Sequence, residues 1–400
     1  MPRAGVVASV LLVVALVTAP AAAGLTVTSP AGTPERQLLT NRTNTSDILR
    51  LPSTNESGLG TATLNLSMAL SAQWQSGRDT IDREALARRV RTVEDSAVKT
   101  RLLMETLRSV NARISTLLAR ERQARLAYAD GPLQKDQYLT RLGAIYAEAA
   151  ELETTLETIQ DLLNEEVTDD PQSVTDTLLR ARARLALITG PLRAELMKAV
   201  QGTGPSPLVY VGVSPAGVTL AAVRGDQFVH ATARFDHFAE PPATDPAGVS
   251  AAIDRWATLY PTVWDPSRVS FRGLGGTYRA SLPFSGGRLI SYLDATTLEI
   301  YRETQFKDLA DVPMQFAVAT TQDNLRLVVE RSYPGGPLHI RFTTSDGDPL
   351  DGLVRVNGLA VGETGADGLL WTLTPGGQFT VSVDYGDRQL TVVVEPTSEF

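Results

Sequence analysis

The chain contains no cysteine and only 3 histidines among its 400 residues. The absence of cysteine excludes disulfide bonds, thiol catalysis, cysteine-ligated zinc and a lipid on an N-terminal cysteine. With so few histidines, there is little material for imidazole metal centres or catalytic triads. We therefore expect no catalytic residues and no cofactor, and we identify one weak candidate for a metal site.

Long apolar runs and excess positive charge are lacking too. No stretch after residue 24 reaches the roughly 20 apolar residues that span a membrane. The formal charge of −8 argues against the broad basic surface that nucleic-acid binding needs. The rest of the composition, 43% hydrophobic and 20% charged, is typical of a globular chain. Since one core seldom exceeds roughly 250 residues, several domains are expected.

The first 23 residues have the three parts of a secretory signal peptide. Arg3 gives a positive start, an apolar run covers residues 6–17, and small residues lead to Gly24. An uncleaved anchor is the alternative, and only then do we expect membrane attachment. Cleavage near Ala23 predicts an exported protein, located outside the cell or at its surface.

Residues 24–60 are rich in Ser, Thr and Asn and are predicted to form a linker. Four glycosylation sequons begin at Asn41, Asn44, Asn55 and Asn65. Their clustering favours a sugar-coated stalk, although a linker of this composition can match the pattern incidentally. Glycosylation at these four asparagines is the prediction.

Residues 61–201 are predicted to form a helical domain, with helix from about residue 79. Two runs of apolar residues repeat at spacings of four and three, as in coiled coils. The first run is Leu103, Leu107, Val110, Ile114 and Leu117, and the second is Tyr138, Leu142, Ile145, Ala149, Leu152, Leu156, Ile159 and Leu163. Gly131 and Pro132 separate them, which predicts a coiled-coil-like helical hairpin. Shorter helices are expected at about 174–188 and from Pro191 onward.

The charges of these helices are complementary. Residues 79–125 carry 11 basic and 7 acidic residues, and residues 126–176 carry 2 basic and 12 acidic residues. We interpret the basic stretch as a face that pairs with its acidic neighbour and sets the helix pairing. The alternative is that the basic face binds a separate partner.

Residues 208–315 are predicted to form an antiparallel α+β domain. Strands are expected at 208–213, 218–223 and 228–235, a helix at 249–260, and four more strands between 269 and 302. The helix and the hairpin from Gly287 to Tyr301, with Asp294-Ala295 at its turn, resemble the PepSY type of module, although Thr297-Leu298 stands where that family usually has Thr-Gly. The resemblance implies a regulator that binds a peptide or a protease.

Residues 321–400 are predicted to form a β-sandwich, with strands at 325–333, 338–344, 353–356, 369–373, 378–384 and 389–395. The segments 354–373 and 376–383 resemble a carboxypeptidase-regulatory or transthyretin-like sandwich, which implies an accessory module without catalytic residues. The domain order and the Gly190-Pro-Leu-Arg193 segment are similar to exported haloarchaeal proteins of unknown function. Usage of 33 Arg against 4 Lys fits such an archaeal source.

Few residues qualify as a chemical site. Asp346, Asp348 and Asp351 share one loop and form a weak calcium candidate, since carboxylates suit Ca²⁺, yet the loop lacks EF-hand spacing. A shared metal site at His230 and His237 is not expected, because in a continuous strand they would face opposite sides. His339 alternates with apolar neighbours and should be solvated.

Two further patterns are weak. The segment Gly273–Thr277 has neither a P-loop lysine nor a following helix, so it does not predict a phosphate site. A hydrolase would need two carboxylates to converge in the fold, and Asp254 with Asp265 is an example of such a pair.

The sequence therefore predicts a multidomain chain with α and α+β parts: an N-terminal helical hairpin or bundle, an antiparallel α+β middle domain and a C-terminal β-sandwich. The leading hypothesis is a non-enzymatic, glycosylated cell-envelope protein that acts in protein interaction or spacing. Its partners would be proteins at the cell surface. The alternatives are a PepSY-like regulator and a hydrolase.

Overall fold

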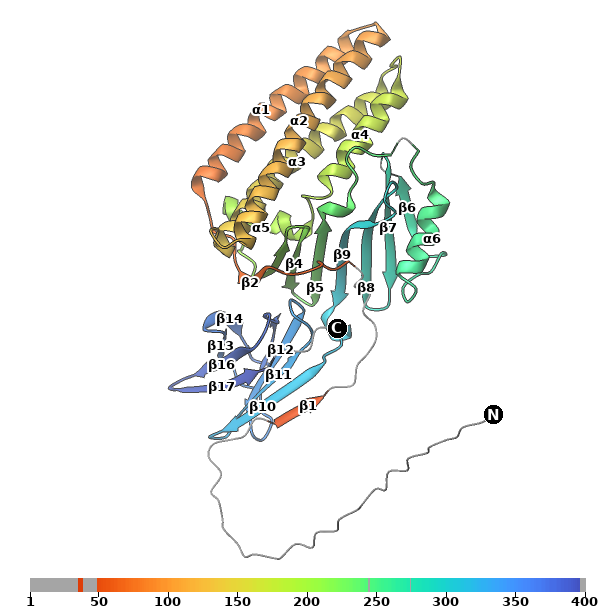
Figure 1. Ribbon diagram of the computed structural model, residues 1–400. Helices are drawn as coiled ribbons and strands as arrows, with labels where there is room; N and C mark the ends of the chain where they lie inside the picture. Colours follow the sequence, from red (N-terminus) through yellow and green to blue (C-terminus); the bar gives the residue numbers. More distant parts are fainter. Residues whose placement is uncertain (1–34, 39–48, 244, 274, 396–400) are drawn as a thin grey trace, which may run out of the picture.

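The computed structural model describes residues 35–38, 49–243, 245–273 and 275–395, with only the backbone of 35–38. Within these ranges, no helix is long and apolar enough to cross a membrane. The predicted signal peptide, Asn41 and Asn44 lie outside the described residues. Figure 1 shows a layer of helices above a large sheet, with a second β-rich body below it.

Five helices precede the large sheet. They are α1 (Leu66–Thr92), α2 (Ser96–Ala129), α3 (Lys135–Glu165), α4 (Pro171–Leu185) and α5 (Pro191–Gln201). The expected helix start near residue 79 is wrong, because α1 begins 13 residues earlier and breaks before Asp95. The Asp95 carboxylate accepts hydrogen bonds from the Ala97 and Val98 N–H groups and so begins a new helix.

Helices α2 and α3 pack together as the predicted antiparallel hairpin. Ion pairs join Lys99 to Glu166 at 2.5 Å and Arg120 to Glu148 at 2.6 Å. Helix α1 adds Arg83–Glu151 at 3.0 Å and Arg91–Glu165 at 2.9 Å, again with α3 as the acidic partner. The predicted pairing of basic and acidic helices is confirmed. Exposed pairs stabilise by only about 0–1 kcal/mol each, so they mainly set which helices pair.

The central sheet has eight antiparallel strands in the order β2-β3-β4-β5-β9-β8-β7-β6. They are β2 (Glu56–Gly60), β3 (Val209–Ser214), β4 (Gly217–Arg224), β5 (Gln227–Arg234), β6 (Ser270–Gly273), β7 (Thr277–Phe284), β8 (Gly287–Asp294) and β9 (Ile300–Asp308). Strand β2 comes from the segment predicted to be a linker, and it forms one edge of the sheet.

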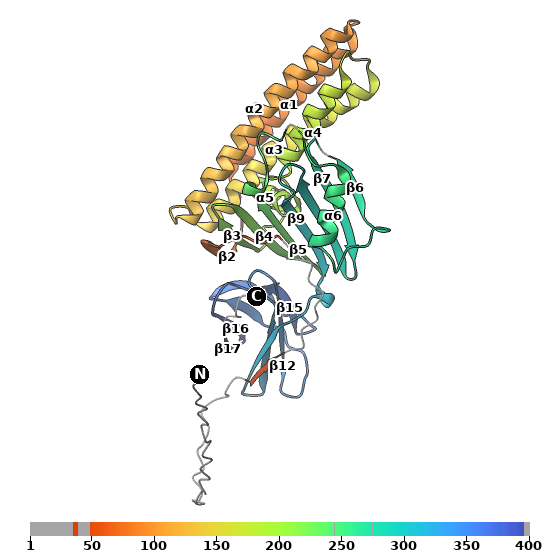
Figure 2. The same ribbon diagram turned by 45° about the vertical axis from the view of Figure 1, so that its right-hand side comes forward.

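Both faces of this sheet are covered, whereas the sequence predicted one helix on one face. Helix α6 (Val249–Leu259) packs through Trp256 against Leu282, Leu289 and Leu293. The opposite face packs against helices α2, α3 and α5, which lie above the sheet in Figure 2. Leu139 and Leu196 share this core with Val211. The helical and middle regions therefore have one continuous core.

The C-terminal sandwich has two sheets, β1-β10-β11-β12-β15 and β14-β13-β16-β17. Its strands are β1 (Glu35–Leu38), β10 (Phe316–Gln322), β11 (Leu325–Arg331), β12 (Pro337–Thr344), β13 (Leu353–Val356), β14 (Leu359–Glu363), β15 (Leu369–Leu373), β16 (Phe379–Tyr385) and β17 (Arg388–Val394). Their inner faces form one apolar core, which also contacts Tyr210 and Phe228 of the large sheet. The predicted multidomain α+β architecture is confirmed.

Candidate functional site

Helix α1 exposes a stripe of large apolar side chains on the outside of the helical layer. Leu66, Leu70, Trp74 and Ile81 are 69%, 59%, 77% and 69% exposed. At 100° per residue, their spacings of 4, 4 and 7 place all four within about 80° of the helix surface. Gly77 falls in the same sector, and a Cβ built on it meets nothing within 4 Å. We call these five residues the α1 stripe.

The chain forms a helix here because Asn65 caps it. The Asn65 side chain accepts a hydrogen bond from the Met68 N–H at 3.0 Å, which satisfies one of the free donors of the first turn. Residues 66–77 contain no charged side chain, whereas 78–92 contain many. The stripe therefore lies mainly on an uncharged half-helix, which can meet another apolar surface without desolvating charge.

The stripe half of α1 contacts the neighbouring helices near both of its ends. Asp79 is buried and accepts two hydrogen bonds from Arg113 of α2, both 2.9 Å long. Met68 is partly buried against the core that α3 and α5 share. Between them, a cavity of about 280 Å³ separates α1 from α3 and α5. Its walls include Ser71, Gln75 and Gly143.

The two described sequon asparagines have different settings. Asn55 is exposed, and its backbone N–H bonds to the Val213 carbonyl just before β2. Asn65 is half-buried, and its side-chain oxygen caps α1. An attached sugar would use the side-chain nitrogen of Asn65, which leaves the capping oxygen free to accept.

The calcium candidate loop is a turn between strands. Among the described residues, no group of three or more acidic or histidine side chains is placed to hold a metal ion. Asp351 instead accepts a hydrogen bond from the Gly365 N–H at 2.9 Å. Asp346, Asp348 and Asp351 are thus not gathered into a metal site.

The prediction that His339 is solvated is wrong, because the residue is buried. Trp371 on β15 pairs with it in register and stacks on its ring at 4.3 Å between centroids. The His339 Nδ1 lies 2.7 Å from Glu330 Oε2, and this hydrogen bond holds the pKa of Glu330 below its ordinary value. The hydrogen bond links the side chains of neighbouring strands β11 and β12, so we assign His339 a structural role.

The remaining histidines and carboxylates do not converge. His230 lies on β5, while His237 lies in a short 3₁₀ turn and bonds to the Ile300 carbonyl at 2.7 Å. Asp254 is exposed on α6, and Asp265 accepts hydrogen bonds from Ser267.

The glycine-rich segment at 273–277 has a packing role. Gly275 has a φ of 48°, and a Cβ on it would lie 2.5 Å from the Arg180 backbone nitrogen of α4. Only glycine allows the segment to approach the helix so closely.

Sequence reasoning missed the α1 stripe because the predicted helix began after four of its five residues. The 4-4-7 spacing from Leu66 to Ile81 was a usable signal, but Ser, Gln and Gly interrupt it and lower the helix propensity. It also missed a buried ionic cluster of Glu121, Arg125 and Arg193. Glu121 and Arg125 are one helical turn apart on α2, but Arg193 lies 68 positions further along the chain, so no periodic pattern links all three.

The fold defines a class: a multidomain α+β chain with a shared helix–sheet core and a C-terminal β-sandwich. The model of an archaeal fibronectin-III type-like domain matches residues 317–392, rather than a carboxypeptidase-regulatory or transthyretin-like one. A family of unknown function, DUF7094, matches residues 209–313. These matches fit the expected archaeal multidomain protein of unknown function.

The family follows from the remaining match. The domain of unknown function DUF7096 matches residues 3–204, just over half of the chain. The chain therefore belongs to the DUF7096 family. The curated proteins and the solved structures gave no match.

Proposed function

We propose that this chain is an exported, non-enzymatic protein of the cell envelope that acts in protein interaction, and that it associates with a second copy of itself through the α1 stripe. The observation that carries the proposal is the exposure of Leu66, Leu70, Trp74 and Ile81 on one face of α1. Clustered apolar side chains of this size on a soluble domain typically mark an interaction site.

The spacing of the stripe suits an antiparallel copy of itself. If two α1 helices pair about a two-fold axis between residues 73 and 74, Leu66 of one copy faces Ile81 of the other. Leu70 then faces Gly77, where the missing Cβ leaves room for it. A patch that is complementary to itself in this way is what a two-fold dimer requires.

Charge and size support the same arrangement. The uncharged residues 66–77 would occupy the centre, and no like charges would meet there. The contact would be about 25 Å long, from the rise of 1.5 Å per residue. A contact of this length lies at the lower end of the size range of specific protein interfaces. For such an interface we expect a Kd of about micromolar magnitude.

The dimer is tested by replacing Trp74 with Glu. In sedimentation equilibrium of the chain without its first 23 residues, the unchanged protein should dimerise. Trp74→Glu should weaken the association about 100-fold or more, since two unpaired carboxylates would be buried near the two-fold axis.

The matched control is Val167→Glu, at another exposed apolar residue that lies outside the stripe. It should leave the association unchanged. A wild-type chain that stays monomeric up to 100-fold above the expected Kd contradicts self-association. A chain that stays monomeric and binds a different surface protein through Trp74 also contradicts self-association. That result would still support a role in protein interaction.

Export and glycosylation are supported by the sequence of the first 67 residues. Mass spectrometry of the chain purified from its natural source should show an N-terminus near Gly24 and hexose-containing adducts on Asn41, Asn44, Asn55 or Asn65. An intact N-terminus on a sugar-free chain from the cell interior would contradict export.

A second candidate, the peptide-binding regulator, is favoured by the free edge of the large sheet. Strand β6 is largely exposed and pairs only with β7 among the described residues. Such an edge can accept an extended peptide as a further strand. This function would be supported if the full chain inhibits exported proteases and Phe271→Pro abolishes the inhibition. A chain that inhibits none of them would contradict it.

A further inference from the structure

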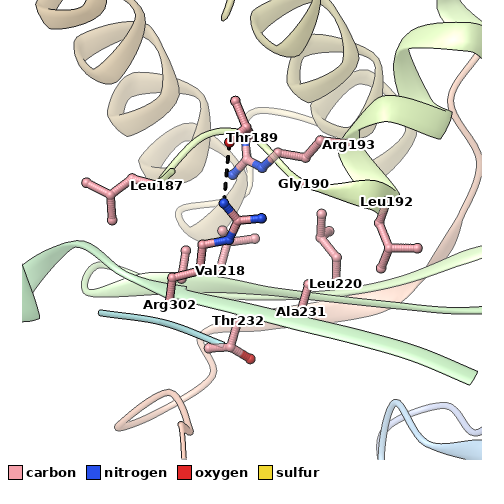
Figure 3. Close-up of a pocket in the computed structure, with 11 residues that line it drawn as sticks. Leu187, Thr189, Gly190, Leu192, Arg193, Val218, Leu220, Ala231, Thr232 and Arg302 are labelled. Carbon is pink, nitrogen blue, oxygen red and sulfur yellow. Dashed lines mark hydrogen bonds between the residues drawn. The ribbon is translucent and has the colours of Figure 1, made fainter. Parts of the chain in front are cut away.

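A small cavity lies where the α4–α5 connection meets the large sheet. Its volume is about 20 Å³, and its walls come from residues 187–193, from β4 and β5, and from Arg302 of β9. Figure 3 shows the guanidinium groups of Arg193 and Arg302 converging in this space from the helical side and from the sheet. A space of this size holds one water molecule or one small ion.

The groups around this cavity carry more positive than negative charge. Arg193 and Arg302 are 4% and 8% exposed, and Arg125 is buried nearby. The carboxylate that acts on Arg193 is Glu121, whose Oε1 lies 3.6 Å from Arg193 Nη2. Among the residues that the structure describes, one carboxylate thus faces three guanidinium groups, and buried charge without a counter-ion is costly.

Arg193 also lacks hydrogen-bond acceptors. Within the described part of the chain, its Nη1 and Nη2 atoms are buried and donate to no acceptor. Arg302 differs, since its Nη1 donates to the Ala186 carbonyl at 2.5 Å and to Thr189 Oγ1 at 3.3 Å. The free donors in this cavity therefore belong to Arg193.

The start of α5 adds to the positive potential. Gly190 provides no side-chain cap, and the first turn contains no acidic residue. The N-terminal end of a helix attracts anions. Gly190 has a φ of 134°, and a Cβ on it would lie 2.5 Å from Arg302 Nη2, so only glycine admits the arginine.

We propose that this cavity binds one halide ion, with chloride as the physiological form. The volume suits a single small ion, and the unpartnered N–H groups of Arg193 supply the donors. The ion would offset the excess positive charge and would link α5 to β9. Burial lowers the pKa of Arg193, while Glu121 opposes this, and a bound anion would favour the charged form further.

The first test is thermal unfolding of the full chain at constant ionic strength, with sodium gluconate replaced stepwise by sodium chloride or bromide. The Tm should rise by about 3 °C or more and then saturate, since a ligand that binds only the folded state stabilises it. Arg193→Met should abolish this dependence. The control Arg182→Met, at a half-buried ion pair with Glu153, should keep it. A Tm that is independent of halide concentration contradicts the proposal.

The second test needs no variant and so does not depend on Arg193→Met folding. Crystals grown with sodium bromide should show an anomalous peak in the cavity, next to the guanidinium group of Arg193. Water alone in the cavity, or bromide on the surface as an adventitious ion only, would overturn the halide site.

Discussion

Glu121→Gln is expected to lower the free energy of unfolding by about 3–5 kcal/mol. The carboxylate is fully buried and pairs with Arg125 at 3.2 Å and with Arg193 at 3.6 Å. It also lies 3.5 Å from the Tyr138 hydroxyl, whose pKa is raised well above its ordinary value because the ring is buried. Tyr138 therefore stays protonated and donates. Without the carboxylate, the buried guanidinium groups lose their negative partner.

Urea unfolding followed by circular dichroism measures this loss. The matched control is Glu148→Gln, because the Arg120–Glu148 pair is partly exposed and should cost less than about 1 kcal/mol. If chloride occupies the neighbouring cavity, raising its concentration should stabilise Glu121→Gln more than it stabilises wild type. A loss below 1 kcal/mol for Glu121→Gln would contradict a stabilising role for these buried ion pairs.

Asp294→Ala should cost about 2–4 kcal/mol, for a different reason. Asp294 is fully buried at the end of β8 and accepts hydrogen bonds from three backbone N–H groups. The donors are Thr296 at 2.8 Å, Thr297 at 3.1 Å and Ala239 at 3.2 Å. Alanine leaves these donors without an acceptor, and each buried unpaired group costs about 1–3 kcal/mol.

Asp294→Asn is the conservative comparison for the same urea measurement. Its amide oxygen can still accept from Thr296 and Thr297, so it should lose clearly less stability than alanine. Leu298 in the same turn has a φ of 55°, a left-handed conformation that is strained for leucine. The hydrogen bonds of the surrounding loop hold it in this conformation. Equal losses for alanine and asparagine would show that the charge of Asp294, rather than its hydrogen bonds, stabilises the hairpin.

Most elements with a buried periodic face were predictable from the sequence. The 4-3 repeats in α2 and α3 and the alternation in β3–β5 correspond to residues in the cores. Elements without such a face were missed. Strands β1 and β2 gain their partners, β10 and β3, from distant parts of the chain. Strand β14 has mainly exposed side chains, so nothing in its own pattern marks it.

The site was less predictable than the fold. The sequence shows Arg193 in a Gly-Pro-Leu-Arg segment, but its pairing with Glu121 depends on a contact across 72 positions of the sequence. His339 shows the limit of alternation as a guide. Its face was assigned correctly to the side of Arg341, but Trp371 on the neighbouring strand covers it.

The absence of cysteine allows a direct test of the α1 dimer, because each introduced thiol is unique. Leu66→Cys and Ile81→Cys would be prepared separately, mixed and treated with a short bis-maleimide. The antiparallel arrangement predicts a cross-linked dimer from the mixture and none from either variant alone, since like positions lie about 22 Å apart. Cross-linking of each variant with itself, or none in the mixture, would contradict the α1 stripe as a two-fold interface.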